Sequence, residues 1–104
     1  MEKILDCIII GGGPGGLTAG IYLKRFRRDI LIIDDQQSRA ALIPMSHNYP
    51  GYPKGISGLD LLKQLKAQLG RYNGQIFIDT VQTIIKGDEY FQVKGMKENF
   101  MQRR

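Results

Sequence analysis

Short apolar runs alternate with helix-compatible stretches along the first 80 residues. Residues 3–10 are almost continuously apolar, residues 30–34 form a second apolar run, and residues 75–79 form a third. Short runs of this kind, rich in isoleucine and without polar alternation, are typical of parallel strands covered on both faces. The pattern therefore predicts three parallel strands at these positions.

The stretch between the first two runs has helical spacing. Leu17, Gly20, Ile21 and Lys24 follow the period of an α-helix, which predicts a helix over residues 14–28. Pro14 is compatible with the first turn of this helix, where a backbone N–H is not needed. Small residues on the same face allow the helix to lie close to the sheet.

A second helix is predicted to start at Ser57, because Ser57 and Asp60 resemble a capping box with Asp in place of Glu. Gly70 or Gly74 can end it. The helical face that is expected to face the core comprises Leu59, Leu62, Leu65 or Lys66, and Leu69.

Residues 35–56 have no periodicity, and three prolines and two glycines oppose regular structure there. A loop of this length in a small domain is usually functional or disordered. Because Ile43, Tyr49 and Tyr52 give it apolar content, we expect an ordered loop that covers a ligand.

The last third of the chain has a different pattern. Residues 81–85 and 90–93 are β-rich runs separated by a Gly-Asp turn, which predicts an antiparallel hairpin. Residues 96–104 look like the approach to a further strand that does not arrive. The elements together predict an α/β fold, with a parallel sheet, flanking helices and a small antiparallel hairpin.

A glycine cluster joins the first predicted strand to the first helix. Gly11, Gly13 and Gly16 have the spacing G-x-G-x-x-G. In a dinucleotide-binding turn the first glycine allows the tight turn, the second lets a pyrophosphate approach the backbone, and the third lets helix and strand pack closely. Asp34 ends the second strand, where an acid can accept hydrogen bonds from an adenosine ribose and would repel a 2′-phosphate. The alternative is a glycine-rich turn in an unrelated α/β protein.

Composition excludes several functions. A chain of 104 residues is one domain at most, and no apolar stretch approaches the length of a membrane span. No signal peptide is visible at the N-terminus, and the lone Cys7 forms no internal disulfide, which fits a cytoplasmic protein. His47 is the single histidine, so metal binding is not expected.

The formal net charge of +5 comes mainly from two basic clusters, one at residues 24–28 and one in the C-terminal tail. Neither cluster contains tryptophan or interleaved aromatic residues. We interpret both as solvated faces, not as a nucleic-acid surface.

Four stretches together are similar to one family. They are Asp6–Gly16, Ile32–Asp34, the sequence HNYPGYP at residues 47–53, and GISG at residues 55–58. The chain resembles, over essentially its whole length, the N-terminal FAD-binding part of bacterial thioredoxin reductases and thioredoxin-reductase-like flavoproteins. The HNYPGYP and GISG elements are more specific than the glycine motif. The resemblance implies a Rossmann-like FAD/NAD(P)-binding fold, present here as an incomplete domain.

The resemblance implies a set of cofactor contacts. The FAD pyrophosphate would lie on the glycine loop and the adenosine ribose on Asp34. Arg39 and its neighbours would line the cofactor, Asn48 would lie near the flavin, and the backbone of Val81 would contact the adenine. The expected cofactor-binding residues are Gly11, Gly12, Gly13, Pro14, Gly15, Gly16, Asp34, Asp35, Arg39, Asn48 and Val81.

The resemblance also implies partners. Members of the family are homodimers that pass electrons from NADPH through FAD to a disulfide or another acceptor. Residues 1–104 are expected to be the N-terminal part of an FAD-binding domain, without the NADPH domain, the C-terminal FAD segment or a C-x-x-C motif. We therefore expect FAD, the missing NADPH domain and a second copy as partners, and self-association through exposed sheet edges.

No side chain is a convincing acid, base or nucleophile, so no catalytic residue is assigned and the isolated chain is expected to be inactive. The main hypothesis is the FAD half-site of an NAD(P)H-dependent flavoprotein oxidoreductase. The alternatives are a non-catalytic module that binds an adenine dinucleotide and an inactive remnant that keeps only the fold.

Overall fold

Three parallel strands form the centre of the computed structural model, which describes residues 3–104. They are β2 (Cys7–Ile10), β3 (Ile30–Asp34) and β4 (Ile76–Ile78), in the spatial order β2-β3-β4. The register pairs Ile9 with Ile32, and Ile33 with Phe77. The predicted parallel sheet is confirmed.

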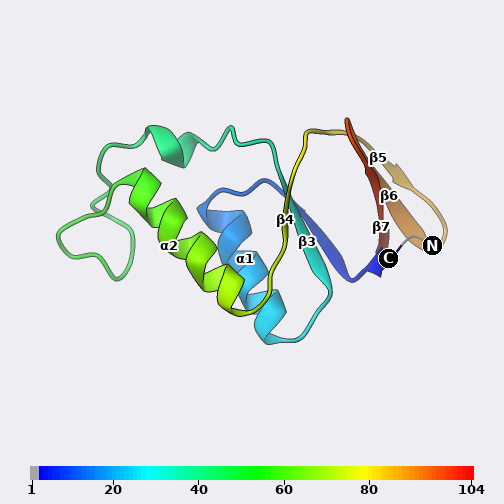
Figure 1. The fold of residues 1–104 in the computed structure, drawn as a ribbon, viewed down its shortest axis with the longest axis horizontal. Helices are drawn as coiled ribbons and strands as arrows, with labels where there is room; N and C mark the ends of the chain where they lie inside the picture. Colours follow the sequence, from blue (N-terminus) through cyan, green and yellow to red (C-terminus); the bar gives the residue numbers. More distant parts are fainter. Residues whose placement is uncertain (1–2) are drawn as a thin grey trace.

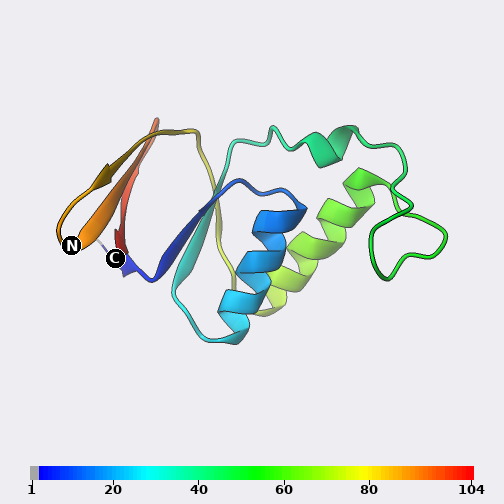
Figure 2. The ribbon, with the colours of Figure 1, turned by 180° about the vertical axis from the view of Figure 1, so that it is seen from behind.

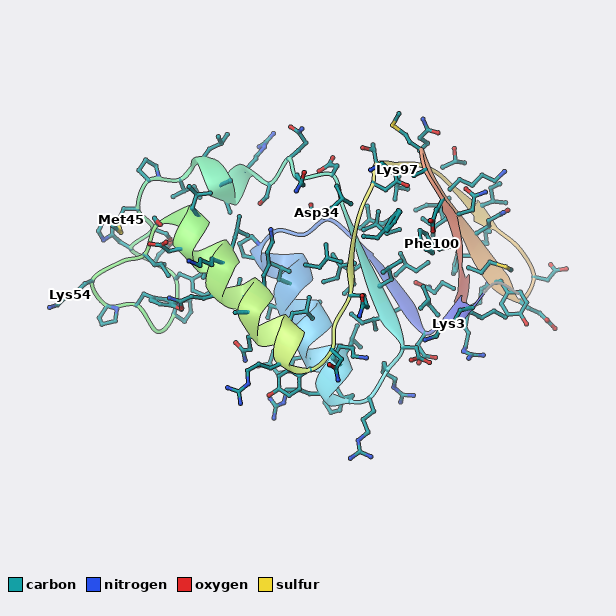
Figure 3. All side chains as sticks on the ribbon, in the orientation of Figure 1. Lys3, Asp34, Met45, Lys54, Lys97 and Phe100 are labelled. Atoms are coloured by element: carbon teal, nitrogen blue, oxygen red, sulfur yellow. The ribbon has the colours of Figure 1, made fainter. Side chains whose placement is uncertain are left out.

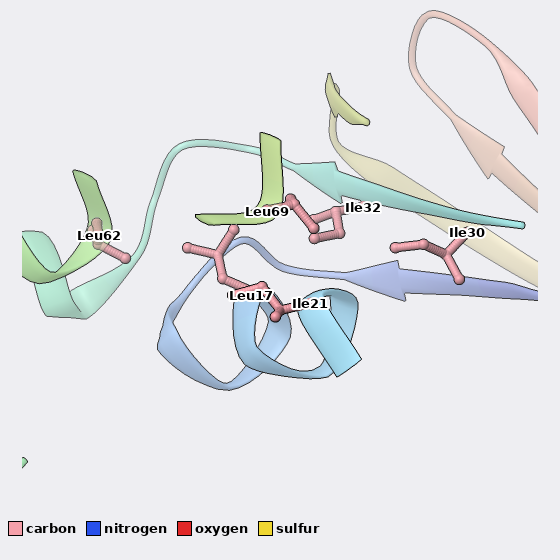
Figure 4. Close-up of a cluster of buried hydrophobic side chains, with 6 residues drawn as sticks. All are labelled: Leu17, Ile21, Ile30, Ile32, Leu62 and Leu69. Carbon is pink, nitrogen blue, oxygen red and sulfur yellow. The ribbon is translucent and has the colours of Figure 1, made fainter. Parts of the chain in front are cut away.

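Two helices cover one face of this sheet (Figure 1). α1 (Pro14–Arg25) connects β2 to β3, and α2 (Gly58–Arg71) precedes β4. Figure 4 shows the core between the helices and the sheet. Its buried side chains are those of Leu17, Ile21, Ile30, Ile32, Leu62 and Leu69. The predicted α/β class is confirmed, with the helices on the side of the sheet opposite the later strands.

α1 ends at Arg25, so the prediction that it reaches residue 28 is wrong. Arg27 adopts a left-handed backbone conformation with φ 59°. The N–H of Arg28 then donates to the carbonyl of Leu23 at 3.0 Å, which closes the helix end. The basic residues beyond this point lie on the turn that leads into β3.

α2 begins as predicted, because the Ser57 hydroxyl accepts a hydrogen bond from the N–H of Asp60 at 3.1 Å. Leu62 and Leu69 are buried, but Leu59 is 65% exposed. The prediction that Leu59 belongs to the core stripe is therefore wrong. Leu59 lies in the first turn of α2, at the margin of the core.

A second sheet of four strands lies on the other side of the parallel sheet (Figure 2). Its order is β1 (Ile4–Leu5), β7 (Asn99–Arg103), β6 (Tyr90–Gly95) and β5 (Val81–Lys86). The predicted hairpin is confirmed as β5 and β6. The prediction that residues 96–104 only lead toward a further strand is wrong. Residues 99–103 form β7 themselves, which pairs antiparallel with β6 and parallel with β1.

The first apolar run is divided between the two sheets. β1 pairs with β7 and β2 pairs with β3, so the prediction of one continuous strand over residues 3–10 is wrong. Asp6 separates them: its N–H donates to the carbonyl of Asp29 at 2.8 Å, and its carboxylate accepts from the N–H of Asp29 at 2.8 Å. A polar residue with local partners lets the chain change sheets at this point.

The segment between β3 and α2 is ordered mainly by turns. It contains one short 3₁₀ helix, η1 (Arg39–Leu42), and an isolated bridge that joins Ser46 to Ile56. The remainder extends beyond the N-terminal end of α2 (Figure 1). Among residues 3–104, no helix is both long and apolar enough to cross a membrane.

Candidate dinucleotide-binding site

The glycine loop forms the turn between β2 and α1 at the carboxyl end of the parallel sheet. Gly11 has φ 109°, which only glycine adopts without strain, and a Cβ at Gly16 would overlap the carbonyl oxygen of Gly11. The predicted roles of these two glycines are confirmed. A side chain would strain the backbone at Gly11 and collide with it at Gly16, which explains why these two positions of the turn are glycine.

The N-terminus of α1 is suited to an anion. Gly13 caps the helix without a side chain, Pro14 lies in the first turn, and the first turn contains no acidic residue. The unpaired N–H groups of the first turn and the positive end of the helix dipole therefore face outward without a competing carboxylate. This geometry fits the pyrophosphate of a dinucleotide.

Asp34 lies directly beside this loop and is only 4% exposed. Its Oδ1 accepts hydrogen bonds from the N–H of Gly12 at 3.1 Å and of Gln36 at 3.2 Å. A Cβ at position 12 would collide with the Asp34 carboxylate. Oδ1 of Asp34 thus holds the glycine loop and the start of the following segment. Because both hydrogen bonds use Oδ1, Oδ2 is available to a ligand hydroxyl.

Two cavities lie on either side of the loop. The first, of about 370 Å³, lies between the segment after β3 and α2, and its polar lining includes Asp34, Ser38, Lys63 and Lys66. The second, of about 110 Å³, lies at the carboxyl ends of the parallel strands and includes Gly11, Asp35, Asp79, Thr80 and Val81. Of the residues that the sequence predicted, Gly11, Asp35 and Val81 are thus brought together at one cavity.

Two further predicted residues lie in the segment between β3 and α2. Arg39 is exposed and begins η1. Asn48 is exposed in the loop before α2, where its Oδ1 accepts a hydrogen bond from the Ser46 hydroxyl at 3.1 Å. Figure 3 shows Met45 and Lys54, which flank Asn48 in this loop, well away from Asp34. The linings of the two cavities beside the glycine loop do not include Asn48.

Two residues at the site were missed by the sequence interpretation. The Ser38 hydroxyl lies so close to the loop that a Cβ at Gly13 would approach it to 3.2 Å. Asp79 is 5% exposed and accepts hydrogen bonds from three backbone N–H groups. Asp79 could have been singled out as an acid directly after a strand. Two of its three partners, Lys97 and Glu98, lie 18 and 19 residues later, however, and have no local signal.

The described residues offer little reactive chemistry of their own. Burial, and then the negative charge of Asp6, raise the pKa of the Cys7 thiol, so Cys7 is a poor nucleophile at neutral pH. Residues 3–104 contain no group of three or more histidine, cysteine or acidic side chains that could hold a metal ion. The arrangement is suited to binding.

A parallel sheet, a glycine turn at a helix N-terminus and an acid at the end of the next strand define an adenine-dinucleotide-binding domain of the Rossmann type. The sequence comparison is more specific: residues 5–102 match the pyridine nucleotide-disulphide oxidoreductase family. The chain belongs to this family.

Curated relatives of the chain are thioredoxin reductases. It is 34% identical over 106 residues to the enzyme from Mycolicibacterium smegmatis, covering 91% of this chain and 34% of the relative. It is 37% identical over 95 residues to the enzyme from Treponema pallidum, covering 89% of this chain and 31% of the relative. The chain thus spans about a third of the length of these relatives and resembles their FAD-binding part.

Solved structures agree with this assignment. Thioredoxin reductase from Streptococcus pyogenes superposes with a TM-score of 0.92 at 28% identity, covering 99% of this chain and 34% of that protein. A ferredoxin-flavin thioredoxin reductase from Clostridium acetobutylicum superposes with a TM-score of 0.85 at 27% identity, covering 100% of this chain and 37% of that protein. The fold is therefore that of part of a thioredoxin-reductase-like flavoprotein.

Proposed function

We propose that residues 1–104 form the adenosine and pyrophosphate half of an FAD site in an NAD(P)H-dependent flavoprotein oxidoreductase. One observation carries the proposal: the N-terminus of α1, free of acidic residues in its first turn, lies beside the buried carboxylate of Asp34. The helix end fits a pyrophosphate, and the carboxylate fits a ribose hydroxyl.

The proposed contacts run along the carboxyl edge of the sheet. The backbone of Gly11–Gly16 would hold the pyrophosphate, Asp34 and Asp35 the ribose, and the backbone of Val81 the adenine. Arg39 and Asn48 would line the path toward the flavin. The flavin, when bound, carries the redox chemistry, and the protein supplies binding and orientation.

The activity of a full-length protein is part of the same proposal. Residues 1–104 would be the N-terminal part of the FAD-binding domain, and a separate domain would bind NADPH. The electron acceptor would be a disulfide or another oxidant, as the names of the relatives suggest. The 104-residue chain alone is expected to be inactive, because its described residues contain no redox dithiol.

We also propose that the chain is cytoplasmic and associates with a second copy of itself. Support for association comes from large apolar side chains on its surface: Ile10, Ile84 and Ile85 are 50%, 54% and 43% exposed. Both β2 and β5 are edge strands, and exposed apolar edges favour pairing between chains.

The absorbance spectrum of the purified chain tests the proposal. The protein is incubated with FAD and desalted, and its spectrum is recorded between about 300 and 550 nm, where only the flavin absorbs. Retained flavin bands that excess ADP displaces would support the proposed half-site. A colourless protein that also fails to bind ADP would contradict the function, whereas ADP binding without retained flavin would favour the non-catalytic nucleotide-binding module.

A further inference from the structure

The corner between β4 and β5 is held by a buried carboxylate. Asp79 accepts hydrogen bonds from the N–H of Thr80 at 2.7 Å, of Lys97 at 3.0 Å and of Glu98 at 3.3 Å. Lys97 and Glu98 belong to the turn between β6 and β7. A single side chain therefore joins two segments that are far apart in the sequence.

Backbone hydrogen bonds fix the same corner from two sides. The N–H of Asp79 donates to the carbonyl of Asp34 at 3.0 Å, and the N–H of Met96 donates to the carbonyl of Thr80 at 3.0 Å. The corner is thus attached both to the end of β3, beside the glycine loop, and to the β6–β7 turn. Figure 3 shows Lys97 and Asp34 in the same upper part of the molecule.

The packing around the carboxylate leaves no free space on one side. A Cβ added to Gly95 would overlap Oδ2 of Asp79 and lie 2.9 Å from its Cγ. Glycine at position 95 therefore permits the close approach of Asp79 to the turn. A larger residue there would have to displace the carboxylate from its backbone donors.

The corner forms one wall of the 110 Å³ cavity at the carboxyl end of the sheet, through Asp79, Thr80 and Val81. The opposite wall includes Gly11 and Asp35, which belong to the proposed FAD site. The shape of this cavity depends on where residues 79–81 are held. Both carboxylate oxygens of Asp79 already accept hydrogen bonds from backbone N–H groups, so the side chain is engaged by the protein itself.

We propose that Asp79 is a positioning residue for adenine recognition: by clasping the β6–β7 turn, it sets the backbone of Val81 at the distance that an adenine ring requires. The inference rests on the proposed function, because it assumes that the cavity receives an adenine nucleotide. It adds to that function a residue that does not itself touch the ligand.

The chain offers a matched control at the opposite end of the sheet. Asp6 also uses its carboxylate to hold distant segments together, accepting from the N–H of Asp29 at 2.8 Å and from Nε of Arg103 at 3.1 Å. Asp6 lies at the amino end of β2, away from the proposed site. Asp6→Asn therefore removes the same negative charge from a similar set of hydrogen bonds without affecting the cavity.

The test is the preference of the chain for ADP over GDP, measured by calorimetric titration of each nucleotide. Wild type and Asp6→Asn should both prefer ADP. In Asp79→Asn the amide nitrogen cannot accept from a backbone N–H, so the preference for ADP over GDP should fall about tenfold. Gly95→Ala, which keeps Asp79 but displaces it, should lower the preference in the same direction.

The results distinguish the inference about Asp79 from the proposed function on which it rests. If Asp79→Asn lowers the affinities for ADP and GDP equally, or leaves the preference unchanged, Asp79 has no part in base recognition. The inference is then wrong, while the proposed FAD half-site stands. If wild type binds neither nucleotide, the proposed function itself is wrong, and the inference with it. If Asp79→Asn does not fold, Gly95→Ala decides; if neither variant folds, Asp79 is a general structural residue and the inference is overturned.

Discussion

Asp34 accepts a hydrogen bond from the N–H of Gly12 at 3.1 Å, although 22 positions separate the two residues. The bond links the end of β3 to the turn after β2. It means that the acid expected to bind a ribose also shapes the loop expected to bind the pyrophosphate. A substitution at Asp34 therefore affects both parts of the proposed site.

Asp34→Asn should weaken binding of ADP or FAD by about tenfold or more, because hydrogen bonds to a charged group contribute roughly 1.5–3 kcal/mol. The amide oxygen can still accept from Gly12, so the loss of stability should stay below about 1 kcal/mol. Titration with ADP and urea denaturation measure the two effects. Asp88→Asn, in the exposed turn between β5 and β6, makes the same charge change away from the site; an equal loss of affinity in both variants would show that only net charge matters.

Gly16→Ala should destabilise the fold by about 3 kcal/mol, since its Cβ would overlap the backbone carbonyl of Gly11 and a backbone atom cannot rotate away. Gly15→Ala provides the control, because a Cβ there meets nothing within 4 Å. That variant should be neutral or up to about 1 kcal/mol more stable, as alanine favours a helix over glycine. Urea denaturation midpoints compare the two. Equal midpoints would contradict the close packing of α1 on the glycine turn.

Leu69→Ala should cost about 2–5 kcal/mol, because Leu69 is 1% exposed and fills the space between α2, Gly20 and Gly74. Leu59→Ala removes the same atoms from a side chain that is 65% exposed, and should change stability by no more than about 0.5 kcal/mol. The pair separates the leucines of α2 that face the core from the one that does not. A large loss for Leu59→Ala would mean that its first turn is covered in solution.

The stability of the chain should fall in acid partly through Asp6. The N–H of Asp29, and then the Arg103 guanidinium, hold the pKa of the Asp6 carboxyl below its ordinary value of 3.8. Because the folded pKa is lower than the unfolded one, ionised Asp6 stabilises the fold above about pH 4, and this contribution is lost as the pH falls through the folded pKa. Thermal unfolding of wild type and Asp6→Asn between pH 7 and about pH 2.5 tests this linkage. The two unfolding temperatures should converge in acid; a constant difference would exclude the linkage.

Local signals predicted most of the α/β part of the fold. The apolar runs at residues 30–34 and 75–79, the Ser57 cap and the glycine turn are each encoded within a few neighbouring residues. The same signals placed Gly11–Gly16 and Asp34 near one edge of the sheet, because the carboxyl ends of parallel strands meet there. Val81 was expected at the site only from the resemblance to thioredoxin reductases.

Features that depend on distant partners were missed. β7 has a polar, weakly alternating sequence, and it is a strand because β1 and β6 flank it on both sides. The break at Asp6 depends on Asp29 and Arg103, and the role of Asp79 depends on the turn at Lys97. None of these pairings leaves a periodic trace in the sequence.

The exposed isoleucines at the edge of the molecule lead to a last prediction. An apolar groove of about 210 Å³ lies between β2 and the second sheet, lined by Ile8, Ile10, Ile84, Phe91, Val93 and Gln102. The Gln102 side chain accepts from the N–H of Ile8 at 2.7 Å, so this backbone donor of the edge strand β2 points toward the second sheet.

Ile84→Lys should reduce self-association, because a charge on an apolar edge opposes pairing between chains. Light scattering over a range of concentrations should show a lower apparent mass for this variant than for wild type. Thr83→Lys adds the same charge at the neighbouring exposed position of β5, whose side chain points to the other face of the strand, and should leave the mass of wild type unchanged. A wild-type chain that is monomeric at all concentrations would rule out association through this surface, and an equal effect of both lysines would assign it to net charge alone.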